Sequence, residues 1–138
     1  MMFLSLLGCL SKPMNIPAVN VTESIETQIN WTEAGEEASQ LLSEYIQIDT
    51  TNPAGNEQRG AEFLGTFLEK EGIEYEIHNS SENRGNLIAR IQGDGTERPL
   101  CLMSHIDVVT AEVEEWEEDP LSGLIKDGYI WGRGALDM

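Results

Sequence analysis

Two stretches of the chain carry apolar residues at the three- and four-residue spacing of an amphipathic helix. The first stretch begins at Thr32, a residue type favoured at the N-cap, and turn-forming residues from 49 to 55 end it. The second is expected to end at Gly72. The apolar face of the first helix consists of Ala34, Ala38, Leu41, Leu42, Tyr45 and Ile46, and that of the second of Ala61, Leu64, Phe67 and Leu68.

The remainder of the chain has the patterns of strands. Apolar residues alternate with polar ones from 73 to 77 and again from 87 to 91, which predicts two strands with one wetter face each. Residues 99–103 show no alternation, and this predicts a strand covered on both faces, as in the middle of a layered α/β sheet. Asp127 and Gly128 lie between two short apolar runs, a pattern typical of a tight hairpin.

The predicted elements form an unbalanced set. Two helices are followed by four or five strands, whereas a layered α/β sheet needs helices on both faces. At 138 residues with 40% apolar content, the chain is long enough for one domain with a core. We therefore expect an α/β fold that is an incomplete three-layer α/β/α domain with a mixed sheet, and we expect more chain after Met138.

The first 31 residues have a different character. Residues 1–10 are mostly apolar and contain Leu6-Leu7-Gly8-Cys9, which resembles the lipobox before the lipidated cysteine of bacterial lipoproteins. No Lys or Arg precedes Cys9, so a chance apolar start is the competing interpretation. Residues 11–31 are polar and without a clear period, as expected of a tether. One hypothesis is thus a lipid-anchored protein of the bacterial cell envelope, and the other a cytoplasmic one.

Charge and cysteine content exclude some functions. The formal net charge is −17, which disfavours binding to nucleic acid or to an anionic membrane surface. The two cysteines, Cys9 and Cys101, form neither a disulfide framework nor a metal-ligand spacing.

The candidate chemistry begins at His105 and Asp107, directly after the apolar run at 99–103. Ligands of open α/β sheets bind outside the carboxyl ends of the strands. A metal-binding imidazole usually donates its other ring N–H to a carboxylate, and the two-residue spacing puts both side chains on one side of an extended segment. His105 would then be a metal ligand and Asp107 its orienting partner. A histidine that ends a strand is, however, more often a hydrogen-bonded surface residue.

The wider sequence supports the metal hypothesis. Residues 103–109, 119–123 and 127–138, with Trp116 between them, resemble in order and spacing the zinc-peptidase family that contains aminoacylase, acetylornithine deacetylase, succinyl-diaminopimelate desuccinylase and glutamate carboxypeptidase. The likeness extends upstream through residues 44–57 and covers roughly residues 33–138. Residues 32–138 would therefore be the N-terminal part of a zinc-hydrolase catalytic domain.

The resemblance implies three site residues. His105 matches the first zinc-binding histidine, Asp107 the catalytic carboxylate that clamps that imidazole, and Asp137 the aspartate that bridges two zinc ions. Thr110 stands where proline is common and Leu121 where phenylalanine is common, but neither position holds a ligand. The three site residues should converge in space. The family has a cis peptide after the bridging aspartate, and we expect this peptide to be trans here and Asp137 to be frayed or misdirected.

The resemblance also implies an activity. The complete protein would use two Zn²⁺ ions to cleave a peptide or an N-acyl amino acid, a small-molecule substrate with a free carboxylate beside the scissile amide bond. Its general base, its remaining ligands and an inserted dimerisation domain would lie beyond Met138, so the full-length protein would form a homodimer. We expect the 138-residue chain alone to be inactive with added zinc, because it lacks the base.

Two other functions stay open. One is an exported binding domain that kept the fold without the chemistry. The other is an aminopeptidase of a neighbouring di-zinc family, against which the loop Gly132-Arg133-Gly134 argues. The acidic residues from 112 to 119 could form a second metal site, but a solvated surface is the more common state of such a run. Trp116 is expected to pack in that loop and His78 to lie on the surface, while Arg133 either orients the turn before Asp137 or is an exposed charge.

Overall fold

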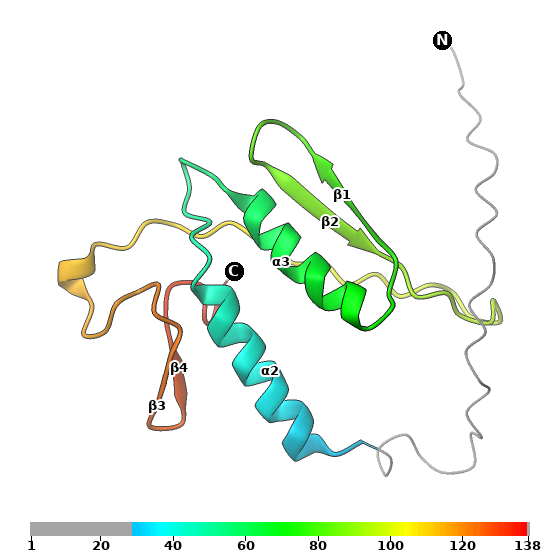
Figure 1. Cartoon of the computed structure of the whole chain (residues 1–138), viewed down its shortest axis with the longest axis horizontal. Helices are drawn as coiled ribbons and strands as arrows, with labels where there is room; N and C mark the ends of the chain where they lie inside the picture. Colours follow the sequence, from blue (N-terminus) through cyan, green and yellow to red (C-terminus); the bar gives the residue numbers. More distant parts are fainter. Residues whose placement is uncertain (1–28, 138) are drawn as a thin grey trace.

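The computed structural model describes residues 29–137. The lipobox-like segment at Cys9 and most of the predicted tether therefore lie outside the described residues. The elements form in the order of the sequence patterns, two helices and then two hairpins (Figure 1). These elements are α2 (Trp31–Ile46), α3 (Glu57–Lys70), β1 (Tyr75–Asn79), β2 (Gly85–Ala89), the 3-10 turn η1 (Val113–Glu115), β3 (Leu124–Lys126) and β4 (Tyr129–Trp131).

The N-cap of helix α2 lies two residues before the predicted position. Its N-cap is Asn30, whose side-chain oxygen accepts a hydrogen bond from the backbone N–H of Glu33 at 3.4 Å. The prediction of Thr32 as the N-cap is therefore wrong, because the asparagine already occupies that role and Thr32 lies inside the first turn. The C-terminal end of α2 buries Tyr45 and Ile46, and the Tyr45 ring stacks on Phe63 of α3 with 5.8 Å between the ring centroids.

Helix α3 packs along the first hairpin (Figure 1). Strands β1 and β2 pair antiparallel, with Tyr75 opposite Ala89 and Asn79 opposite Gly85, which confirms both predicted strands. A Cβ atom added to Gly65 of α3 would lie 2.6 Å from the Tyr75 ring, so only glycine allows this close approach. The hairpin and α3 together form one packed unit.

The second hairpin lies beside the C-terminal end of α2 (Figure 1). Strands β3 and β4 are joined by Asp127 and Gly128, whose φ angles of 54° and 80° are both positive, as a type I′ turn requires. This confirms the predicted hairpin. The Ser43 hydroxyl of α2 donates to the carbonyl of Gly123 at 2.6 Å and connects the helix to the start of β3.

The prediction of a buried strand at residues 99–103 is wrong for the described structure. The segment forms no strand, and Leu100, Leu102 and Met103 have exposed fractions of 83%, 85% and 90%. A central strand needs a neighbour on each edge and cover on each face. Residues 29–137 provide neither, because their sheets are two separate antiparallel pairs. The described residues thus confirm the α/β class, while the three-layer arrangement and the mixed sheet are not formed within them.

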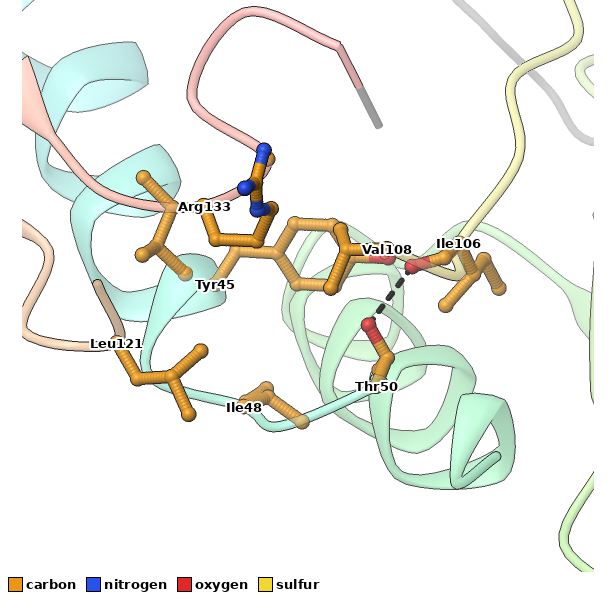
Figure 2. Close-up of a pocket in the computed structure, with 9 residues that line it drawn as sticks. Tyr45, Ile48, Thr50, Ile106, Val108, Leu121 and Arg133 are labelled. Atoms are coloured by element: carbon orange, nitrogen blue, oxygen red, sulfur yellow. Dashed lines mark hydrogen bonds between the residues drawn. The ribbon is translucent and has the colours of Figure 1, made fainter. Parts of the chain in front are cut away.

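The segment after these residues is attached to the rest of the molecule at Val108. The backbone N–H of Val108 donates to the carbonyl of Thr50 at 3.3 Å, and the N–H of Asn52 donates to the carbonyl of Val108 at 2.8 Å. This is an isolated parallel bridge. The hydroxyl of Thr50 adds a bond to the carbonyl of Ile106 at 2.9 Å, seen in Figure 2 beside a small cavity of about 10 Å³ between α2 and the 106–108 segment.

The buried hydrophobic core is small and lies at this junction. It consists of Tyr45, Ile46, Ala61 and Val108. Gly60 of α3 permits the junction, because a Cβ atom there would lie 2.8 Å from the side chain of Ile106. In residues 29–137 no helix is long and apolar enough to cross a membrane.

The contact between Gly123 and α2 gives a test of this packing. A Cβ atom at Gly123 would lie 2.1 Å from the Ser43 carbonyl oxygen, and its φ is +60°. We expect Gly123→Ala to lower the free energy of unfolding by about 2–4 kcal/mol, because the overlap is with backbone that cannot rotate away. Gly72→Ala is the matched control, since Gly72 has φ +68° and open space around it. It should cost about 1 kcal/mol, the strain of a positive φ alone. Equal losses in urea denaturation would contradict the described contact.

Candidate metal site

His105 is fixed by acceptors from Asp107. Its ring Nδ1 lies 2.7 Å from the backbone oxygen of Asp107 and 3.3 Å from Oδ1 of the same residue. Both oxygens are acceptors, so the geometry favours a proton on Nδ1. When Nδ1 carries the only ring proton, the lone pair is on Nε2 and is available to a metal. The segment that carries both residues is extended loop rather than the end of a strand, so the predicted position at a strand end is wrong although the two side chains meet.

Asp137 lies on the other side of the His105 ring. Its Oδ1 is 3.1 Å from Nε2, although thirty-two residues separate them in the sequence. The β3–β4 hairpin turns the chain back to make this contact, as the requirement for convergence predicts. Asp137 is directed at His105 while its side chain is 94% exposed, which differs from the expected misdirected carboxylate. The peptide between Asp137 and Met138 lies outside the described residues.

Asp107 also has a partner from the turn that precedes α3. The side-chain amide of Asn52 donates from Nδ2 to Oδ2 of Asp107 at 2.8 Å. This hydrogen bond is the main reason why the pKa of Asp107 is below its ordinary value, and the charge of His105 contributes in the same direction. The two oxygens of Asp107 therefore have separate partners, with Oδ1 facing His105 and Oδ2 facing Asn52.

Behind Asn52 lies an ion pair that is partly buried. Arg84 donates from Nη1 to Oε1 of Glu57 at 2.6 Å, and the exposed fractions of the two side chains are 32% and 10%. Its Nη2 donates to Oδ1 of Asn52 at 3.0 Å and to the carbonyl of Pro53 at 3.1 Å. Arg84 thus joins the hairpin, the start of α3 and the turn before it.

Sequence reasoning missed Asn52, Glu57 and Arg84 as parts of the site. Asn52 lies in a segment dense in turn formers and Arg84 in an Asn-Arg-Gly turn, where polar residues are ordinarily solvated. Glu57 is in the first turn of a helix, a common place for an acidic residue. No spacing in the sequence shows that these three residues meet, because each comes from a different element.

The carboxylates around His105 change its protonation. The hydrogen bond to Asp137 is the main cause that raises the pKa of His105, followed by the bond to the backbone oxygen of Asp107. Each ring nitrogen faces an acceptor, so the charged imidazolium is favoured when no metal is bound. A metal ion would take the place of the proton on Nε2, between the ring and Asp137.

The donor types fit a zinc ion. Imidazole nitrogen and carboxylate oxygen are common zinc ligands, and bond lengths of about 2.0–2.2 Å place two such donors on one ion roughly 3–4 Å apart. The separation between His105 Nε2 and Asp137 Oδ1 lies in that range. Within residues 29–137 no group of three or more His, Cys, Asp or Glu residues is arranged to hold a metal. The described residues thus contribute two donors, fewer than the three protein ligands of a catalytic zinc.

An open depression of about 320 Å³ borders His105 and Asp107, and its wall includes Glu57, Arg84 and Ser104. It is polar and gives access to the candidate site from solvent. The predicted solvation of the acidic run is confirmed, since most of its carboxylates are exposed.

The remaining candidates lie away from His105 or act on the loop before Asp137. His78 is on the surface, with 58% of its side chain exposed, as predicted. Arg133 lies over the Trp116 ring at 5.1 Å and donates to the carbonyl of Thr110 at 3.3 Å. These contacts favour the interpretation that Arg133 orients the loop that carries Asp137, and they show that Trp116 packs in the acidic loop as expected.

Comparisons with known proteins find one family profile and several relatives that match this chain. Residues 101–138 match the sequence profile of peptidase family M20/M25/M40. An N-fatty-acyl-amino acid synthase/hydrolase of Mus musculus is 58% identical over 48 residues, which are 34% of this chain and 10% of the relative. The protein of the same name in Xenopus tropicalis is 33% identical over 137 residues, which are 91% of this chain and 26% of the relative.

A succinyl-diaminopimelate desuccinylase of a Wolbachia from Culex pipiens is 34% identical over 101 residues, which are 72% of this chain and 24% of the relative. The chain thus spans about a quarter of the length of the relatives that it matches along most of its own length.

The contact between His105 and Asp137 predicts a pH effect. In the metal-free protein, Asp137→Asn should lower the pKa of His105, because the hydrogen bond from the imidazolium to a charged carboxylate, the main cause of the raised pKa, is replaced by a weaker one to a neutral amide. Folding raises the pKa of His105, so protonation of His105 stabilises the folded state at pH values below its unfolded pKa. This stabilisation is lost as the pH rises through the folded pKa. Titration of the His105 ring protons by NMR measures the pKa of His105 in the wild type and in Asp137→Asn. Asp127→Asn, in the exposed hairpin turn, is the control, and an equal pKa in wild type and Asp137→Asn would contradict the described contact.

Proposed function

Because the chain belongs to peptidase family M20/M25/M40, we propose that it forms part of the catalytic domain of a zinc-dependent amide hydrolase. The observation that carries this proposal is the convergence of two carboxylates on opposite sides of one imidazole. Asp107 contacts Nδ1 of His105, and Asp137 contacts Nε2. An exposed surface histidine needs no such pair of partners.

We propose a separate role for each of the three residues. His105 would hold zinc through Nε2, Asp107 would keep the proton on Nδ1 and orient the ring, and Asp137 would be the carboxylate shared by a pair of zinc ions. Bound zinc lowers the pKa of a water ligand to about 7 and polarises the scissile carbonyl. The general base and the remaining ligands come from outside residues 1–138, which is consistent with relatives about four times longer.

We propose that the three-layer α/β/α fold forms when the rest of such a domain is present. The support is the state of residues 99–103, where consecutive side chains on both sides of the extended segment are exposed. Leu100, Leu102 and Met103 are apolar residues of the kind found in a central strand, and here they lack the neighbouring strands that would bury them. A mixed sheet would form around this segment and bring helices onto both faces.

The proposed substrate is an N-acyl amino acid or a peptide with a free carboxylate beside the scissile amide bond. The names of the relatives refer to fatty-acyl-amino acids and to succinyl-diaminopimelate, and both are compounds of this kind. A full-length homodimer is part of the same proposal.

Attachment of lipid at Cys9 and a place in the cell envelope are a separate proposal, supported only by the sequence Leu6-Leu7-Gly8-Cys9. Mass spectrometry of the protein from its own host should give a mature N-terminus at a modified Cys9. A protein that retains Met1 and an unmodified Cys9 would contradict it.

Hydrolysis assays with the natural full-length protein test the proposed activity. We expect turnover of N-acyl amino acids that a chelator abolishes and added Zn²⁺ restores. His105→Ala should remove both zinc and activity. Asp107→Ala should lower activity about 10–100-fold, the usual effect of losing the partner of a metal-binding histidine. His78→Ala, which changes the chain's other histidine, is the matched control and should retain full activity.

Two results would contradict this proposal. One is hydrolysis that persists in the chelator, since it would exclude a metal-dependent site. The other is equal activity of His105→Ala and His78→Ala, which would remove His105 from the site. Specific zinc-free binding of an N-acyl amino acid with no turnover would instead support a binding domain.

A further inference from the structure

We propose that Asn52 is a positioning residue for Asp107, and that the Glu57–Arg84 ion pair sets the direction in which the Asn52 amide points. This inference rests on the proposed zinc site. It extends the support of His105 through Asp107 to three residues whose hydrogen bonds do not reach His105 itself.

The polarity of the amide carries the argument. The oxygen of the Asn52 side chain accepts from Arg84 at 3.0 Å, while its nitrogen donates to Asp107 at 2.8 Å. A flipped amide would turn its NH₂ group toward the guanidinium, two donors face to face, and its oxygen toward the carboxylate, two acceptors face to face. Arg84 therefore permits only the orientation in which Asn52 donates to Asp107.

Arg84 can set this direction because it is itself fixed on several sides. Glu57 binds one of its nitrogens, and the Pro53 carbonyl shares the other with Asn52. Gly55, with φ +72°, lies against the guanidinium so closely that a Cβ atom would be 2.6 Å from Nε. A planar cation with this many contacts has little freedom to follow a rotating amide.

The consequence falls on the two oxygens of Asp107. Its side chain is 42% exposed, so without Asn52 the carboxylate could rotate into solvent. Asn52 holds Oδ2, which leaves Oδ1 directed at Nδ1 of His105. The Asp107 backbone oxygen also accepts from Nδ1, at 2.7 Å, so the side-chain oxygen at 3.3 Å is the second acceptor of the ring, and it is this second contact that depends on Asn52 and, behind it, on the Glu57–Arg84 ion pair.

The backbone of Asn52 is fixed independently of its side chain. Its N–H donates to the carbonyl of Val108 at 2.8 Å, a contact that any residue other than proline can make. Substitutions of the Asn52 side chain therefore test positioning with the backbone bridge retained.

The key variant is Asn52→Asp in the natural full-length protein. The new carboxylate still accepts from Arg84, so the structural contact is kept, but it presents an oxygen instead of a donor to Asp107. We expect the dissociation constant for Zn²⁺ to rise about 10-fold or more, in the range typical of lost outer partners of metal ligands. The Nδ1–H resonance of His105 in the zinc-bound protein should also shift, because the Asp107 carboxylate no longer faces it while the backbone oxygen still does. Asn52→Ala should act in the same direction.

Asn79→Asp is the control for the added negative charge. The Asn79 side chain donates to Gln58 of α3 at 3.1 Å and not to Asp107. Asn79→Asp adds the same charge as Asn52→Asp, but on an exposed side chain, where solvent screens it. Zinc binding and the His105 resonance should be unchanged.

The part played by Arg84 is tested by a double substitution. Arg84→Met should weaken zinc binding, because the amide of Asn52 is then free to flip. If Arg84 acts through Asn52, the variant Asn52→Ala/Arg84→Met binds zinc no more weakly than Asn52→Ala alone. Additive losses would overturn the role of Arg84 in setting the amide direction.

The outcomes separate this inference from the proposed function. If His105→Ala abolishes zinc binding while Asn52→Asp leaves both the zinc dissociation constant and the His105 resonance unchanged, the positioning role is wrong and the zinc site stands. If His105→Ala binds zinc as wild type does, the proposed site itself is wrong. Loss of folding stability in Asn52→Asp with unchanged zinc binding would make Asn52 a structural residue only.

Discussion

The pairing of residues 50–52 with residues 106–108 is the constraint on which the candidate site depends. Two backbone hydrogen bonds and the Thr50 hydroxyl join segments that are more than fifty residues apart. Gly60 leaves the space for this junction against α3. Because the bridge fixes Val108, it also fixes the positions of His105 and Asp107 just before it. The same bridge brings Asn52 next to Asp107, so one short contact establishes both the site and its support.

A series of side chains in which donors and acceptors are paired leads from this junction to His105. Glu57, Arg84, Asn52, Asp107 and His105 form a continuous series in which every donor faces an acceptor. The inner end of the series is an ion pair in which Glu57 is buried and Arg84 partly exposed, and the outer end is an imidazole open to solvent. Such an order places the rigid contacts behind the candidate ligand and leaves Nε2 accessible. A hydrogen-bonded series of this kind is satisfied only as a whole, because removing one member leaves its neighbours without partners.

The sequence predicted what depends on local pattern and failed where distant parts must meet. Helical spacing located α2 and α3, and the Asp127-Gly128 pair located the second hairpin. The order of motifs around His105 and Asp137 identified the residues that approach each other. The apolar run at 99–103 was read as a buried strand, but burial depends on neighbours that residues 29–137 do not contain. Arg84 could not be found from the sequence, because an ion pair between a turn and a helix has no periodicity.

In the proposed site, His105 and Asp137 hold the same zinc ion while Asp107 holds the His105 ring. Anomalous scattering at the zinc edge from crystals of the natural full-length protein would locate that ion. We expect an anomalous peak bonded to Nε2 of His105 and to the Asp137 carboxylate at about 2.0–2.2 Å, with Nδ1 of His105 still facing Asp107. A peak bonded to Nδ1, or a zinc ion remote from His105, would contradict it.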